Sequence, residues 1–160
     1  MTRTKHIVPE GAPLTMRGAR RLLKLARFLR ERVPKEKFDF TVIMQQGENP
    51  PLEALKLGAH KCGTVGCAIG WMPAVWPKQL EWDTFQCVVI RDDEQNIGAD
   101  FRVAREWFRI SDTDADYLFM PNWGHSVGRD ATPKAVADHI RRFVKARYEG
   151  KAQLDYGVAK

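Results

Sequence analysis

The chain has 160 residues, of which 44% are hydrophobic and 29% are charged, so its length suits one domain and is too short for two of ordinary size. This amount of apolar surface excludes a disordered chain, and no run of 18 apolar residues is present to form a membrane-spanning helix. The N-terminal residues lead into no apolar segment, which predicts that a secretory signal is absent. The three cysteines, an odd number, are therefore expected to be reduced thiols in the cytoplasm.

The formal net charge of +6 is distributed unevenly along the chain. Residues 17–37 hold nine Lys or Arg against two Glu, whereas residues 38–131 hold 14 acidic against eight basic residues. Residues 132–160 are basic again. Two interpretations follow. Either the basic segments form a surface for an acidic partner, or the acidic middle covers them through ion pairs within the chain.

The first element in chain order is an irregular arm over residues 1–13, which contain two prolines and a glycine. Thr15 is placed to cap a helix that ends at about Val33, before Pro34. Its apolar positions follow the spacing of one helical face: Ala19, Leu22, Leu23, Ala26, Leu29 and Val33. The other side of this helix carries the basic residues Arg17, Arg20, Arg21, Lys24 and Arg27.

The middle of the chain contains a strand-like segment and an apolar segment. Residues 38–45 alternate as a strand does, although a short helix is the alternative. Residues 65–76 are apolar nearly all round, which predicts a buried central helix. On that helix the residues expected in the core are Val65, Ala68, Ile69 and Met72, with Gly66 and Gly70 against another element.

The remaining elements are a strand over residues 85–90 and three helices. The first covers residues 99–109, and the second is capped by Ser111 and stops before Pro121. The last begins at Thr132 and runs to about Tyr148. The sequence thus predicts a mainly α (α+β) fold: one compact domain over 14–149, with four or five helices, a minor β element and a tail over 150–160.

One segment carries a resemblance. Cys62-Gly-Thr-Val-Gly-Cys67-Ala-Ile-Gly-Trp71 resembles the C-G-T-x-x-C-x-x-G-[HW] motif of a family of small bacterial and phage proteins. The stretches 104–121 and 132–143 are similar to two further blocks of that family. The resemblance implies a single recurrent domain and an association with phage. Because the family has no established activity, it implies no mechanism.

The cysteine motif also raises two chemical alternatives. His60, Cys62 and Cys67 could supply zinc ligands, but structural zinc sites usually use two tight pairs and only one loose pair is present. Cys62, just before the predicted helix, could be a nucleophile with His60 or His125 as its base. No other complete catalytic motif is present. We therefore favour a protein without enzymatic activity, metal or other cofactor, in which Cys67 is a core residue.

The basic helices provide the better candidates for function. The predicted binding residues are cations of the helices over 15–33 and 132–148, together with Trp123 in a glycine-containing loop: Arg17, Arg20, Arg21, Lys24, Arg27, Arg141, Arg142 and Lys145. These patterns favour a non-enzymatic accessory protein in the cytoplasm that binds an acidic protein surface and no membrane. Nucleic-acid binding by the same two helices is the first alternative, and an enzyme centred on Cys62 is the second.

Overall fold

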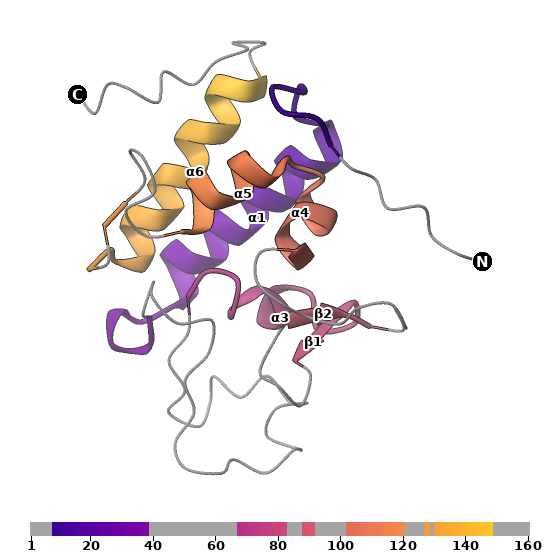
Figure 1. Ribbon diagram of the computed structural model, residues 1–160. Coiled ribbons are helices and arrows are strands. Elements are labelled where there is room, and N and C mark those ends of the chain that lie inside the picture. The colour runs from indigo at the N-terminus through magenta and orange to yellow at the C-terminus, as the bar shows by residue number, and fades with distance from the viewer. Residues whose placement is uncertain are drawn as a thin grey trace.

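The structure is a computed structural model that describes residues 8–38, 67–82, 88–91, 102–120, 127–128 and 130–148. Within these ranges the chain forms five α-helices, a short 3-10 helix at Lys35–Lys37 and a two-stranded sheet (Figure 1). The predicted mainly α (α+β) fold is therefore confirmed. The predicted element over residues 38–45 lies outside the described residues, apart from Phe38.

Helix α1 (Met16–Arg32) begins and ends where the sequence predicts. The hydroxyl of Thr15 accepts a hydrogen bond of 3.0 Å from the backbone N–H of Gly18, and Val33 ends the helix in an extended conformation before Pro34. The predicted apolar face is wrong at one position, because Leu23 is exposed and Leu25 is buried in its place. Leu25 is the residue turned toward the core, whereas Leu23 lies at the edge of the apolar stripe.

Helix α6 (Pro133–Tyr148) packs along α1, and the two cross the molecule side by side in Figure 1. Thr132 caps it by accepting a 3.1 Å hydrogen bond from the backbone N–H of Ala135. Its inward face is the predicted one: Val136, Ile140, Phe143 and Val144 are buried. Arg30 of α1 donates to Asp138 at 2.7 Å, so the C-terminal end of α1 lies beside the N-terminal half of α6.

Helices α4 (Arg102–Phe108) and α5 (Asp112–Phe119) form a short pair that packs on α1 and α6. The predicted cap is confirmed, since the Ser111 hydroxyl accepts from the backbone N–H of Asp114 at 3.2 Å. The end of α4 meets the first turn of α1, where a Cβ at Gly18 would lie 2.2 Å from the carbonyl oxygen of Phe108. Only glycine permits this approach between the two helices.

The predicted continuous helix over residues 65–76 is wrong within the described part of that segment. Residues 68–71 form turns, and helix α3 covers only Met72–Val75. Pro73 explains the interruption because it has no N–H to continue the hydrogen-bond ladder; the N–H of Met72 instead bonds to the carbonyl of Ile69 at 2.9 Å. The predicted burial holds, since Ala68, Ile69 and Met72 are fully buried; Val65 and Gly66 lie outside the described residues.

The sheet consists of β1 (Leu80–Trp82) and β2 (Val88–Ile90), paired antiparallel with Leu80 opposite Ile90. The second strand falls within the predicted strand over 85–90, whereas the first was not predicted. Strand β1 follows directly on α3, and both contribute buried side chains to a core shared with α1, α4, α5 and α6. The described helices and the sheet thus share one connected core.

A buried ion pair joins α5 to α6 inside this framework. Arg147 donates to the Asp114 carboxylate, and their side chains are only 5% and 6% exposed. Nearby, His139 is buried, with its Nε2 atom 2.9 Å from the carbonyl oxygen of Tyr117. The polar groups of α6 are therefore divided between this inner face and an exposed basic face.

Candidate functional site

A groove of about 390 Å³ runs along the surface between α1 and α6. Its lining consists of two small residues between the helices, three large apolar side chains and three cations: Ala19 and Val144; Met16, Leu23 and Tyr148; Arg20, Arg141 and Lys145. All eight residues come from two helices whose starts are set by threonine caps. The groove is therefore built on rigid elements, not on loops.

The apolar lining of this α1/α6 groove is its most unusual property. Met16 is 53% exposed, Leu23 41% and Tyr148 55%, and these are the exposed large hydrophobic residues of the described chain. All three line the same groove. Scattered exposed apolar residues are normal on a protein surface, but a cluster of them indicates a contact surface.

The three cations of the groove come from both predicted basic helices. Arg20 projects from α1, and Arg141 and Lys145 project from α6 one turn apart, all exposed. Among the described residues, no carboxylate forms an ion pair with any of the three. The groove consequently combines an apolar surface with positive charge that is available to an incoming ligand.

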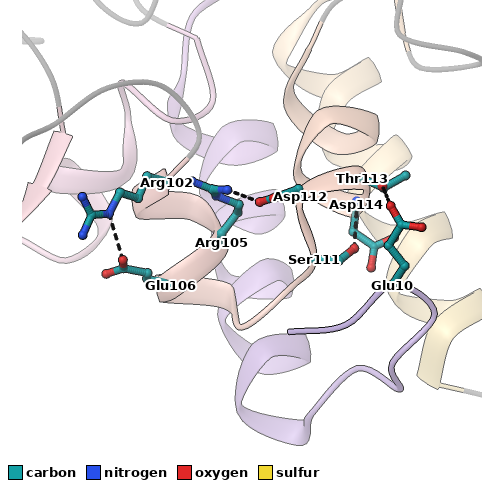
Figure 2. A network of polar contacts seen from close by, with 8 residues as sticks. All are labelled: Glu10, Arg102, Arg105, Glu106, Ser111, Asp112, Thr113 and Asp114. Atoms are coloured by element: carbon teal, nitrogen blue, oxygen red, sulfur yellow. Dashed lines mark hydrogen bonds and ion pairs between the residues drawn. The ribbon is translucent and has the colours of Figure 1, made fainter. Parts of the chain in front are cut away.

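Of the acidic middle, residues 38–131, the structure describes only a part, and the ion pairs in that part join its carboxylates to arginines outside α1. Figure 2 shows Arg102 beside Glu106 and Arg105 beside Asp112, with Glu10 of the N-terminal arm held by Thr113. Two further carboxylates of the acidic middle also pair with arginines: Glu81 with Arg91, and Asp114 with Arg147. Within the described ranges, these carboxylates do not cover the basic face of α1.

Two of the predicted binding residues are engaged within the chain, contrary to the expectation of an unpaired stripe. Arg21 is half-buried; its Nη1 donates to the carbonyl oxygen of Trp107 at 2.7 Å and its guanidinium lies 3.7 Å from the Trp107 ring centre. Burial, together with the charges of Arg17 and Arg109, lowers the pKa of Arg21 to about 10. Arg27 pairs with Glu31 one turn along the same helix at 3.2 Å.

Arg21 caps the last turn of α4. A cation at a helix C-terminus satisfies an orphan carbonyl and interacts favourably with the helix dipole. A helical wheel of α1 places Arg21 on the polar side and carries no signal that the end of α4 approaches there. Lys24 lies on the same side, with Nζ 5.6 Å from the Trp76 ring centre. Arg17, Lys24 and Arg142 remain exposed outside the groove lining.

The cysteine alternatives are tested only at one residue. Cys67 is buried in the core, whereas His60, Cys62, His125 and Trp123 lie outside the described residues. Across the described ranges, no three His, Cys, Asp or Glu side chains gather as a metal site requires. The described structure therefore contributes no geometry to a zinc or cysteine mechanism.

Sequence reasoning missed the apolar half of the groove. Met16 and Tyr148 occupy helix ends, and Leu23 was assigned to the core. The available signal was that Leu23 lies between two cations, Arg20 and Lys24, at the edge of the apolar stripe. A leucine at such an edge stays exposed unless a neighbouring element covers it, and Leu23 is 41% exposed beside α6.

Comparisons with known proteins identify no relative of this chain. No family model, no curated protein and no solved structure matches it. No described helix is both long enough and apolar enough to cross a membrane. The α1/α6 groove and its charges are therefore the basis for a functional proposal.

Proposed function

We propose that this protein acts without enzymatic activity, by docking an acidic surface of a partner protein into the α1/α6 groove. The observation that carries the proposal is that the exposed large apolar residues of the described chain, Met16, Leu23 and Tyr148, line one groove with three cations. Aromatic and arginine side chains are common at the buried centre of protein–protein interfaces. We place this role in the cytoplasm, and the association with phage rests on the Cys62–Trp71 resemblance.

The charges and the apolar residues would contribute different parts of the binding. Arg20, Arg141 and Lys145 attract acidic partners and raise the rate of encounter, an effect that salt weakens. Burial of Met16, Leu23 and Tyr148 then slows dissociation because it removes apolar area from water. Eight lining residues form a small interface of the kind used by transient partners.

Binding of nucleic acid is the second candidate, and it is favoured by a different group of cations. Arg17 and Arg109 lie near enough to Arg21 to help lower its pKa. Arg109 is exposed just after α4, where its φ of 54° forms the left-handed C-cap of that helix, with the Ile110 N–H bonded to the Arg105 carbonyl at 3.1 Å. If these cations bind phosphates, the affinity for a DNA or RNA oligonucleotide should fall steeply between low and moderate salt.

The experiment compares two doubly charge-reversed variants of the full-length protein. Arg20→Glu/Lys145→Glu alters the groove, and Arg17→Glu/Arg142→Glu is the matched control, since it changes one exposed cation on each of the same helices outside the groove. Proteins recovered with the tagged wild type from its native cells, after nuclease treatment, are purified and their affinities for all three forms are measured.

The proposal predicts that the groove variant loses an acidic protein partner at unchanged melting temperature, while the control retains it. Equal retention by both variants would contradict the proposal. Loss of the association on nuclease treatment alone would favour the nucleic-acid candidate. Self-association of the wild type that only the groove variant abolishes would identify a second copy of this chain as the occupant.

A further inference from the structure

We infer that the occupant of the groove is a single amphipathic α-helix of the partner, with acidic residues four apart along one side of its apolar stripe. This inference rests on the proposed function and specifies its partner. It follows from three properties of the groove: its dimensions, the secondary structure of its walls and the unequal distribution of charge between them.

The groove is about two helical turns long. On α1 its lining extends from Met16 to Leu23, and on α6 from Arg141 to Tyr148. Seven residues at 1.5 Å each give about 10 Å along either wall. Because Arg30 contacts Asp138 while Met16 and Tyr148 line the groove, the two walls run antiparallel. A third helix can lie along two such helices and place two or three side chains between them.

Both walls of the groove are helices, and this argues against a partner that docks as an added β-strand. A β-strand docks by pairing with the free N–H and C=O groups of a sheet edge. Apart from the first N–H groups of α1 and the last C=O groups of α6, the backbone groups along the groove are hydrogen-bonded within their own helices, so they offer no continuous edge of this kind. Recognition must then come from side chains, which is how a helix binds in a groove.

The small residues between the walls favour the same conclusion. Ala19 and Val144 lie in the lining between larger neighbours, and Val144 is only 5% exposed. A large apolar side chain of the incoming helix could therefore enter between Met16 and Leu23 and contact Val144. Apolar residues three or four apart on the docking helix would extend this contact along the groove.

The two walls differ in charge, which sets the pattern of the docking helix. The α6 wall presents Arg141 and Lys145 four residues apart, whereas the α1 wall presents Met16 and Leu23 on either side of Arg20. Side chains four apart on a helix lie about 6 Å from each other. Two carboxylates at the same spacing would face Arg141 and Lys145 together, while apolar residues face α1.

The test selects ligands from an unconstrained library of random 18-residue peptides displayed on cells, with the full-length protein as bait. We expect the enriched peptides to carry Asp or Glu four residues apart beside an apolar helical stripe, and to become helical on binding. Affinity should fall about tenfold or more, equivalent to about 1.4 kcal/mol, for Arg141→Gln/Lys145→Gln. The matched control Arg17→Gln/Arg142→Gln should change it less than twofold.

Three results would overturn the inference: no enriched peptide, enriched peptides that lack this pattern or stay extended when bound, or equal affinities for the groove and control variants. Its failure is distinguishable from failure of the proposed function. If the native partner is lost from the groove variant but binds through a segment other than an acidic helix, only the inference fails. If the native partner binds the groove variant as well as it binds the wild type, the proposed function fails as well.

Discussion

Arg20 and Arg21 are neighbours on α1, yet their surroundings differ completely. Arg21 is half-buried, bonded to the Trp107 carbonyl and stacked on the Trp107 ring. Arg20 is exposed in the α1/α6 groove and, among the described residues, has no carboxylate partner. The same residue type is a structural cap in one position and an open binding group in the next. Both residues belong to the same helix, so the element that packs beside each one determines its role.

The same division separates residues of α6. Arg147 is buried with Asp114, while Lys145, two residues earlier, lines the groove. Replacing a residue on the structural side should lower the free energy of unfolding. Replacing a residue on the groove side should lower the affinity for the partner and leave the free energy of unfolding unchanged.

Replacement of Arg147 by Met should lower the free energy of unfolding by about 3–5 kcal/mol, because it leaves the Asp114 carboxylate buried without its charge partner. The matched control Lys145→Met should stay within about 0.5 kcal/mol. The measurement is urea unfolding of both variants and the wild type. The double variant Asp114→Leu/Arg147→Met should regain most of the loss. If Arg147→Met is as stable as the control, the pair is not a structural element.

Leu25 and Leu23 provide the second test on a single helix. Leu25→Ala should cost about 2–5 kcal/mol because it opens a cavity in the core. Leu23→Ala should change stability by less than about 0.5 kcal/mol, since Leu23 is 41% exposed. Thermal or urea unfolding checks both values. A large loss at Leu23 would mean that some part of the chain covers the groove.

Arg21→Gln should cost about 1–2 kcal/mol of stability, because it removes a charged hydrogen bond to Trp107 and the contact with its ring. Arg20→Gln should be neutral within about 0.5 kcal/mol. Partner affinity should show the reverse order, with the larger loss at Arg20. Equal stability of the two variants would show that Arg21 does not act as a cap for α4.

The smallest effect concerns pH and the buried His139. Burial lowers the pKa of His139, with a further contribution from the charge of Arg142 and an opposing one from the Tyr117 carbonyl. The unfolded chain therefore binds a proton at His139 at a higher pH than the folded chain does, so stability should fall as pH decreases below about 6.5. His139→Gln should show a shallower decrease in urea-unfolding free energy between pH 7 and 5. A curve parallel to that of the wild type would contradict this assignment.

Local signals made most of the helices predictable. Thr15, Ser111 and Thr132 accept cap hydrogen bonds as expected, because a cap depends on residues three positions apart. Pro73 was the local signal that was overlooked in the segment over 65–76. The pairing of β1 with β2 depends on a contact between separate segments, and Leu80–Trp82 is too short to show a strand pattern.

The candidate site was predictable only in part, for a physical reason. Exposed cations on α1 and α6 could be identified from each helix alone, and Arg20, Arg141 and Lys145 do line one groove. The engagement of Arg21 and the exposure of Leu23 depend on where α4 and α6 pack against α1. Such contacts join residues more than 80 positions apart, as the bond from Arg21 to Trp107 does. The pattern of one helix does not contain them.

The antiparallel pairing of α1 and α6 also determines how this protein can be handled. Met16 is the first residue of α1 and Tyr148 is the last residue of α6, and both line the groove. The chain therefore enters the first helix and leaves the last helix at the same end of the groove, which we call its rim. A domain fused a few residues beyond Tyr148 would be held beside that rim, at a high effective concentration over the groove.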